Sequence, residues 1–341
     1  MKKLSKLLAF SLAGALALSL AACGTNTDGN ANTQSPAPSA NGTSAGPTGE
    51  TYTVGICQLA PHDALDAATQ GFKDALTETF GDAVTFEEGN AGGDSNNCIT
   101  IIDGFLSADV DLILANATAA LTAAASATDT IPILGTAVTN YGIALNLDST
   151  EDNVLGGNIS GTSDLAPLDQ QADMLQELFP DAQAVGLLYC SAEPNSVYQV
   201  ETIQGYLEEM GYTCTAYAFT DVNDLASVTQ TACDNSDVIY VPTDNTAANN
   251  TETIANVVLA AGVPVVAGES GICSGCGVAT LSIDYYELGQ ITGQMAARIL
   301  TGEEAVSEMA IEYDTTLTKL YNAENCEALG ITVPDDYEPL V

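Results

Sequence analysis

The hydrophobic and polar positions of residues 52 to 267 alternate between two periods. Short apolar runs typical of buried strands are followed by longer segments in which apolar residues recur every three or four positions, as on one face of a helix. The expected strands of the first half span 52–59, 84–87, 111–115 and 131–135, with helices over 63–80, 96–107 and 117–128. The pattern restarts with strands over 184–189, 213–219, 237–241 and 263–267, and helices over 194–210, 222–233 and 246–261. This order predicts an α/β fold with two Rossmann-like lobes, each built on a parallel sheet.

The two halves also resemble each other in sequence. Asp111-Leu-Ile-Leu, followed by Thr118-Ala-Ala and Ile131-Pro-Ile-Leu-Gly, parallels Asp237-Val-Ile-Tyr, followed by Thr246-Ala-Ala and Val263-Pro-Val-Val-Ala-Gly. Generic strand-helix-strand units can agree this well by chance. The prediction of two lobes therefore rests on the alternation itself and on a length greater than one core usually serves.

The N-terminus has a different pattern. Lys2 and Lys3 precede an apolar run over 7–22 that is shorter than a membrane-spanning helix, which predicts a cleaved secretory signal over residues 1–22. Its Leu-Ala-Ala-Cys23 ending resembles the lipobox of bacterial lipoproteins. The resemblance implies that Cys23 becomes the lipidated, palmitate-bearing first residue of an exported protein anchored to the outer face of the cytoplasmic membrane. The alternative is an ordinary signal peptide with a chance cysteine.

Residues 23–51 are expected to form a flexible tether. They are almost entirely Asn, Thr, Ser, Gly, Pro and Ala, so they cannot build a core. A coil of this length reaches about 30 Å, enough to hold a folded domain clear of a membrane surface.

The charge balance excludes several classes of partner and site. The chain has 45 acidic and 6 basic residues, and outside the signal only Lys73, Arg298 and Lys319 are basic. So few cations cannot neutralise a phosphate backbone, which excludes nucleic acid as a partner. A single histidine, His62, and no loop with EF-hand spacing predict no metal site, and we expect no cofactor.

Eight cysteines follow Cys23, and in an exported chain they permit disulfides that sequence cannot pair. Cys273-Ser-Gly-Cys276 has the spacing of a redox pair. A thioredoxin-like site needs this pair at the start of a helix, whereas glycines flank it here and an extended run follows. A loop disulfide or two free thiols is the favoured interpretation.

In open parallel sheets, ligands bind beyond the carboxyl ends of the strands. The polar residues at these ends are Gln58, His62, Asn116, Thr118, Thr136, Thr139 and Asn140 in the first half, and Glu193, Asn195, Ser196, Thr243, Asp244, Asn245, Glu269 and Ser270 in the second. Lys and Arg are missing from this set, which disfavours phosphate as a ligand. An ammonium group suits Glu193, Asp244 and Asp284, and a carboxylate suits hydroxyls and helix N-termini. A zwitterionic amino acid satisfies both, although each residue alone is more often a helix cap.

An enzyme is not expected. His62-Asp63 has no Gly-x-Ser-x-Gly nucleophile to serve, and no phosphate-cradling Gly-x-x-x-x-Gly-Lys-Ser/Thr loop is present. Two lobes and a polar cleft without cations need no catalysis to explain them.

Several segments together resemble a known family. They are Val54-Gly-Ile-Cys-Gln58 through Asp66, Asn90-Ala-Gly-Gly-Asp94, Ala117-Thr-Ala-Ala120, Glu193-Pro-Asn-Ser196, Val241-Pro-Thr-Asp-Asn-Thr246 and Ile283-Asp-Tyr-Tyr-Glu-Leu-Gly289. They look like the ABC transporter substrate-binding proteins of the tryptophan/tyrosine type, over residues 52 to 315. The resemblance implies a type I periplasmic-binding-protein architecture, in which two lobes joined by three hinge crossovers close on a small ligand.

The resemblance also implies boundaries and a site. Residues 52–162 and 285–309 would form lobe 1, and 163–284 and 310–341 lobe 2. The cleft would be lined by Gln58, His62, Thr118, Thr139, Asn140, Ser163, Asp164, Glu193, Asn195, Ser196, Asp244, Asn245 and Asp284. Where relatives commonly carry Thr-Asp-Pro, this chain has Thr139-Asn140-Tyr141, which removes a carboxylate and adds a ring that could stack on an aromatic ligand.

The function implied is that of a monomeric solute-binding lipoprotein of an ABC importer. It would capture an amino acid, aromatic or hydrophobic, and deliver it to a permease driven by an ATPase subunit. A ligand-sensing lipoprotein of the same fold is the alternative, and an extracellular enzyme is a distant third.

Overall fold

The computed structural model of the chain describes residues 50–147 and 153–340, which belong to one compact unit. The expected signal, Cys23 and nearly all of the expected tether lie outside these residues. Across the part that is described, we find no helix with the length and apolar character needed to cross a membrane.

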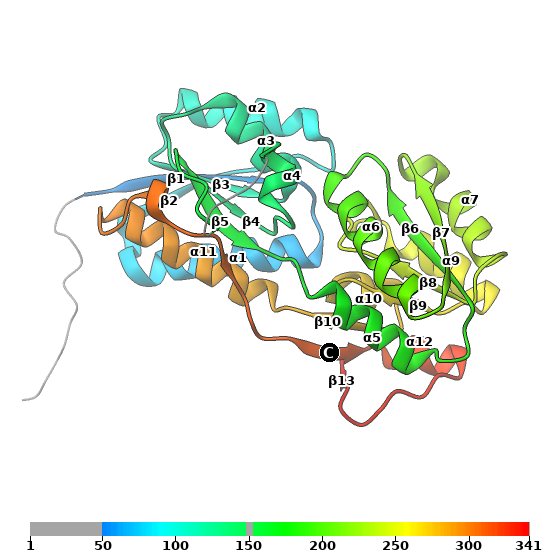
Figure 1. Cartoon of the computed structure of the whole chain (residues 1–341). Coiled ribbons are helices and arrows are strands. Elements are labelled where there is room, and N and C mark those ends of the chain that lie inside the picture. Colours follow the sequence, from blue (N-terminus) through cyan, green and yellow to red (C-terminus); the bar gives the residue numbers. More distant parts are fainter. Residues whose placement is uncertain (1–49, 148–152, 341) are drawn as a thin grey trace, which may run out of the picture. The chain divides into compact units, whose positions relative to one another are not determined.

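The first lobe is built on a six-stranded sheet in which every pairing is parallel. Its strands, in spatial order, are β11 (Glu312–Tyr313), β5 (Ile159–Ser163), β4 (Ile133–Thr136), β3 (Leu112–Asn116), β1 (Tyr52–Gln58) and β2 (Val84–Asn90). Its helices are α1 (Asp63–Phe80), α2 (Ser95–Ser107), α3 (Thr118–Ala127), α4 (Tyr141–Leu145) and α11 (Tyr285–Leu300). Figure 1 shows α1 and α11 together on one side of this sheet, with α2 and α3 on the other.

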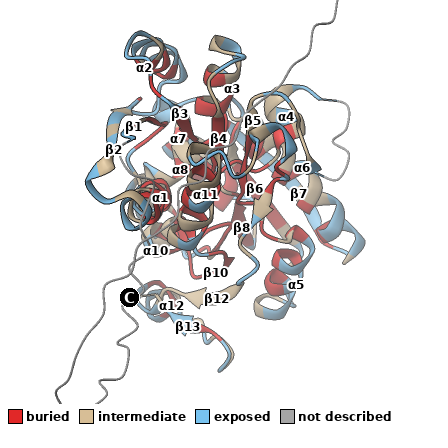
Figure 2. Ribbon diagram, turned by 90° about the vertical axis from the view of Figure 1, so that its left-hand side faces the viewer, coloured by how far each residue is buried: buried red, intermediate tan, exposed pale blue. Residues whose placement is uncertain are grey.

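The second lobe has a seven-stranded sheet, parallel except at β12. In spatial order its strands are β13 (Glu338–Pro339), β12 (Thr318–Tyr321), β10 (Ala279–Ser282), β9 (Val265–Ala267), β8 (Val238–Val241), β6 (Ala184–Cys190) and β7 (Thr213–Phe219). The helices are α5 (Leu168–Leu178), α6 (Pro194–Glu209), α7 (Val222–Cys233), α8 (Asn245–Ala248), α9 (Thr251–Ala261), α10 (Ser270–Cys276) and α12 (Ala323–Leu329). The predicted fold class, two α/β lobes with parallel sheets, is confirmed. In Figure 2 the buried residues follow the strands and the helix faces turned toward them.

Three crossovers join the lobes, after β5, after β10 and after β11. The third one differs from the expectation near Ala310. Glu312–Tyr313 pairs with β5 in the first sheet, and Arg298 of α11 holds Glu312 in an ion pair of 2.5 Å. The chain therefore leaves the first lobe only after Tyr313.

The helix expected over 246–261 is two helices. α8 ends at Ala248 and α9 begins at Thr251. The Asn250 side chain donates to the carbonyl oxygen of Thr246 at 2.8 Å, and such side-chain bonds to the backbone compete with helix continuation.

The segment carrying Cys273 and Cys276 is the short helix α10, so the expectation of a non-helical loop is wrong. All eight cysteines of the described residues are free thiols. Burial raises the pKa of both Cys273 and Cys276, the opposite of the shift that activates a redox thiol. Of the two favoured interpretations, a loop disulfide or two free thiols, the structure shows the second for Cys273 and Cys276.

The sequence echo between the halves has a structural counterpart. Asp111, just before β3, accepts a hydrogen bond from the backbone N–H of Thr53 at 2.7 Å. Asp237, just before β8, accepts from Gln183 and Ala184 at 2.8 and 2.9 Å. In both lobes this aspartate accepts hydrogen bonds from backbone N–H groups at the start of the neighbouring strand.

Helices α1 and α11 approach closely through glycines. A Cβ atom on Gly289 would lie 2.1 Å from the carbonyl oxygen of Ala68, and one on Gly71 would lie 2.0 Å from that of Tyr286. The close approach lets Phe72 and Met295 pack into one buried cluster. α11 is thereby fixed against α1 of the first lobe from the end that follows the second crossover.

Gly289→Ala is expected to destabilise the protein by about 1–3 kcal/mol, because the helices must separate to admit one methyl group. The matched control is Gly205→Ala in α6, where nothing lies within 4 Å of the added Cβ; there, higher helix propensity should raise stability by up to about 1 kcal/mol. Thermal unfolding of the two variants should give shifts of opposite sign. Equal shifts would contradict the close-packing argument.

Candidate ligand-binding site

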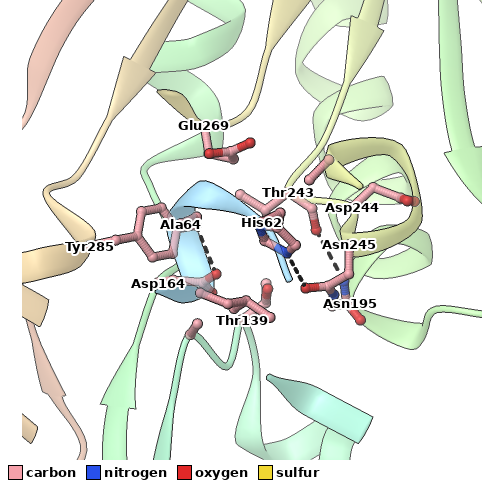
Figure 3. A pocket seen from close by; sticks show the side chains of 13 residues that line it. His62, Ala64, Thr139, Asp164, Asn195, Thr243, Asp244, Asn245, Glu269 and Tyr285 are labelled. Carbon is pink, nitrogen blue, oxygen red and sulfur yellow. Dashed lines mark hydrogen bonds between the residues drawn. The ribbon is translucent and has the colours of Figure 1, made fainter. Parts of the chain in front are cut away.

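A small buried cavity lies where the carboxyl ends of the strands of the two sheets face each other (Figure 3). Its volume is about 20 Å³, little more than one water molecule occupies. Its lining consists of His62, Ala64, Leu65, Ala137, Thr139, Asp164, Asn195, Thr243, Asp244, Asn245, Ala248, Glu269 and Tyr285. The lobes thus meet around a polar interior.

Two hydrogen bonds cross between the lobes at this cavity. His62, which precedes α1, places Nε2 3.2 Å from Asn245 Oδ1 at the start of α8. Gln199 of α6 donates to the Thr139 hydroxyl at 3.4 Å. Burial lowers the pKa of His62, which favours the neutral ring in this contact.

Asp164 lies in the first crossover, directly after β5. The Tyr285 hydroxyl, at the start of α11, donates to its Oδ2 at 3.0 Å, so the pair links the first crossover to the second. Its Oδ1 is buried and has no hydrogen-bond partner among the described residues. Burial, its largest influence, raises the pKa of Asp164, and the hydroxyls of Tyr285 and Thr139 oppose the rise.

Glu269 follows β9 and caps α10. Its carboxylate accepts from the backbone N–H groups of Gly271, at 2.6 Å, and Ile272. Burial raises the pKa of Glu269 to about 7, and nearby Asp63 and Asp164 add to the rise. Asp164 and Glu269 thus place two buried carboxyl groups at one cavity.

Asp244 also lines the cavity, but both of its oxygens are engaged. It accepts from the backbone N–H groups of Cys190 at 2.7 Å and Ala247 at 2.8 Å, tying the end of β6 to the start of α8. Burial, followed by the charge of Glu193, raises its pKa to about 7.

Glu193 holds the loop between β8 and α8. Its two oxygens accept from the backbone and side chain of Asn245 at 3.0 and 2.7 Å, and from those of Thr246 at 2.8 and 2.7 Å. Glu193 does not line the cavity. It orients Asn245, whose Oδ1 faces His62.

The structure brings His62, Thr139, Asp164, Asn195, Asp244 and Asn245 together from the predicted set. The others lie outside the cavity. Gln58 bonds Asp66 and Thr69, Asn140 and Asp284 cap α4 and α11, and Ser163 and Ser196 form bonds within their own lobes. Thr118, Glu193 and Asn195 line a neighbouring groove of about 500 Å³ between α2 and α3 of the first lobe and the start of α6. Their roles as ligand contacts stay predictions.

Tyr141 does not form the stacking surface that its position suggested. Its ring is buried in the first lobe against Gly135 and Gly161, and its hydroxyl donates to the carbonyl oxygen of Thr162 at 3.0 Å. The glycines leave the room that this ring fills.

Thr243, Glu269 and Tyr285 line the cavity without having been among the predicted contacts. The first two do follow strands β8 and β9, so the strand-end rule marks them. The Thr243 hydroxyl is buried and has no partner among the described residues. In the same described part, His, Cys, Asp and Glu side chains form no group suited to hold a metal ion.

Two lobes with strand ends facing a polar cavity, joined by three crossovers, define a ligand-binding protein of the type I periplasmic-binding-protein fold. The chain belongs to the family of ABC transporter substrate-binding proteins, whose model matches residues 53–338. The family consists of binding proteins and not enzymes, which confirms that prediction, and the predicted resemblance is confirmed with it.

Relatives agree with this assignment. The chain is 32% identical over 338 residues to a tyrosine-binding protein of Clostridioides difficile, covering 97% of this chain and 94% of the relative. An ABC domain from Streptococcus pneumoniae in complex with L-Trp superposes with a TM-score of 0.79 at 29% identity, covering 84% of this chain and all of that one.

A third relative is the ligand-free, open structure of a substrate-binding protein with adhesive properties from Clostridium difficile. It superposes with a TM-score of 0.66 at 33% identity, covering 85% of this chain and 99% of that one. The chain therefore superposes less well on this open structure than on the L-Trp complex, despite the higher identity. The small volume of the cavity agrees with this difference, because lobes that are apart would leave a larger space between them.

Stability should fall as the pH rises from about 4 to about 7, because Glu269 and Asp244 hold protons up to about pH 7 when folded but only to about pH 4 when unfolded. The folded state then binds more protons in this window. Glu269→Gln should flatten the pH dependence of the melting temperature. Glu201→Gln, an exposed change on α6, should leave the slope unaltered, and equal slopes for all three proteins would contradict the assignment.

Proposed function

We propose that this chain is the extracytoplasmic ligand-capturing component of an ABC importer and that its cleft binds a free amino acid with an aromatic or hydrophobic side chain. The observation that carries the ligand class is the lining of the cavity, which includes the buried carboxyl groups of Asp164 and Glu269 and neither Lys nor Arg. A buried carboxylate is costly unless it meets a cation or hydrogen-bond donors. A ligand ammonium group supplies both.

Each part of an amino acid has a counterpart in the lining. The ammonium group faces Asp164 Oδ1, which accepts no hydrogen bond from the described residues, and lies near Glu269, whose two oxygens already accept backbone N–H groups. The carboxylate is met by neutral donors, the hydroxyls of Thr139 and Thr243. Apolar groups line the rest of the cavity and accommodate the side chain: Ala64, Leu65, Ala137, Ala248 and the ring of Tyr285.

The relatives support the same ligand class. One is named for binding tyrosine, and a solved structure of another holds L-Trp. At 32% and 29% identity the side-chain specificity can differ, so the proposal extends to aromatic and hydrophobic amino acids in general.

Capture requires the lobes to separate, since a cavity of about 20 Å³ cannot admit an amino acid. Opening breaks the contacts of His62 with Asn245 and of Gln199 with Thr139, which are long at 3.2 and 3.4 Å and weak. A ligand that bonds to both lobes then stabilises the closed form by its higher affinity for that form. The closed form is the one that a permease would recognise.

The position of the protein outside the membrane follows from its N-terminal segment. The Leu-Ala-Ala-Cys23-Gly sequence at the end of an apolar run supports lipidation of Cys23. The polar segment after it leaves the two lobes free to reach a permease that works with an ATPase subunit.

Aromatic amino acids should raise the melting temperature of the protein more than glutamate, a nucleoside or a sugar does. At a ligand concentration of 100 times Kd the stabilisation is about 2.7 kcal/mol, which is several degrees for a protein of this size. A thermal-shift panel measures this directly. Stabilisation by sugars or nucleosides and by no amino acid would reject the proposed ligand class.

Asp164→Asn should weaken binding of the best amino acid by about 10- to 150-fold, the loss of a charged hydrogen bond of about 1.5–3 kcal/mol. Asp181→Asn is the matched control, because Asp181 is exposed between α5 and β6 and does not line the cavity. Calorimetric titration should show near-unchanged affinity for the control. If both variants bind as tightly as the parent, Asp164 does not contact the ligand.

Cys23→Ser should release the protein from membranes, because serine cannot form the thioether to the lipid. Cys214→Ser, a change of a partly buried cysteine in β7, should leave the protein membrane-bound. Fractionation of expressing cells and mass spectrometry of the N-terminal peptide measure both. Equal membrane fractions would show that Cys23 does not anchor the chain.

A further inference from the structure

The cations of the described residues are all engaged far from the cavity lining. Lys73 pairs with Glu88 at 2.5 Å, and Arg298 pairs with Glu304 and Glu312 at 2.9 and 2.5 Å. Lys319 pairs with Glu177 and Asp336 at 2.8 and 2.9 Å. None of the three cations lines the cavity, and burial lowers the pKa of His62, which does line it, so a positive charge beside the cavity carboxyl groups comes from the ligand.

The cavity is lined by three carboxyl groups and by neither lysine nor arginine. Asp164, Asp244 and Glu269 are 5%, 1% and 3% exposed, and burial raises the pKa of each. Asp244 and Glu269 each accept backbone N–H groups with both oxygens. Asp164 keeps Oδ1 without a partner among the described residues. The site therefore offers carboxyl groups, which a cation beside them would favour in the ionised form, but only neutral donors for an anion.

The two ends of a zwitterionic ligand are consequently recognised unequally. Hydrogen bonds to an ion are strongest when the partner is itself charged, and only the ammonium end has such partners here. The carboxylate end gains bonds from neutral groups such as the Thr139 and Thr243 hydroxyls. It also meets the repulsion of nearby carboxylates in a low-dielectric cavity, and these two effects oppose each other.

We propose that the same cleft binds primary amines without a carboxylate, above all aromatic monoamines, as a second class of ligand. The inference rests on the proposed function, in which Asp164 and Glu269 receive the ammonium group of an amino acid. An amine lacks the carboxylate, so it loses the hydrogen bonds from neutral hydroxyl groups. It also avoids the repulsion between that carboxylate and the carboxyl groups of the cavity. Its affinity therefore stays close to that of the matching amino acid.

A ligand that keeps the carboxylate but lacks the ammonium group is expected to bind far more weakly. An acid with the same side chain but no ammonium group brings a negative charge to Asp164 and Glu269 and offers Asp164 Oδ1 no donor. The cleft thus selects for the amine end of its ligands, and the carboxylate end is dispensable.

The test is calorimetric titration of the full chain with four compounds that share one side chain: tyrosine, tyramine, tyrosine methyl ester and 3-(4-hydroxyphenyl)propionate. Tyramine and the ester should bind within 30-fold of tyrosine, and the propionate at least 100-fold more weakly. Saturating tyramine should abolish the heat of tyrosine binding, which places both in one cleft. Tyrosine binding with tyramine more than 30-fold weaker overturns the inference and leaves the proposed function intact.

Failure of the proposed function has a different signature. If neither tyrosine nor any other amino acid of the thermal-shift panel binds, the function falls and the inference with it. The same four compounds with the phenylalanine side chain serve if phenylalanine stabilises the protein more than tyrosine does.

A pair of variants tests the charge argument separately. Asp164→Asn removes a charge that attracts both ligands at the ammonium end and repels only the amino acid at the carboxylate end. The ratio of tyramine to tyrosine affinity should therefore fall at least threefold in this variant. In Asp181→Asn, an exposed change between α5 and β6, the ratio should stay as in the parent protein. An unchanged ratio in Asp164→Asn would overturn the inference.

Discussion

The loops around the cavity are held by carboxylates that accept hydrogen bonds from backbone N–H groups, because the chain has 45 acidic residues and very few cations to pair with them. Asp244 joins the end of β6 to α8, and Glu269 turns the chain from β9 into α10. The same groups that fix the loops leave buried carboxyl groups whose pKa is raised, at a cost to the folded state. A ligand that brings a positive charge offsets this cost, so loop architecture and ligand recognition depend on the same interaction.

Hydrophobic periodicity predicts most of the fold, because each buried face repeats with the period of its element. The bounds of α1 and β7 follow directly from it. Hydrophobic periodicity does not predict an element boundary that is set by the hydrogen bonds of one side chain. Asn250 breaks a helix by bonding the Thr246 carbonyl, and Glu269 starts a helix at a glycine-flanked cysteine pair. These effects involve single hydrogen bonds and leave no periodic signal.

The strand-end rule predicts where the site lies but not which side chains face it. His62, Thr139 and Asn245 follow strands and line the cavity, whereas Gln58 is the last residue of β1 and turns inward to α1. Whether such a side chain faces the cavity depends on the hydrogen-bond partners that other helices and strands place near it. Tyr285 reaches the cavity from a crossover and is outside the reach of a rule based on strand ends.

The first lobe is assembled from two stretches of chain separated by most of the second sheet. Phe72 and Leu76 of α1 are buried with Met295 of α11, which is synthesised more than half the chain later. While the chain leaves the ribosome, α1 can pack on the early strands of its own sheet, but the part of its surface that contacts α11 stays uncovered until after β6 to β10 have emerged. Domains generally fold in the order of their synthesis. Here the first lobe is completed by α11 and β11 only after most of the second lobe has been made, and the second lobe is completed later still, by β12 and β13.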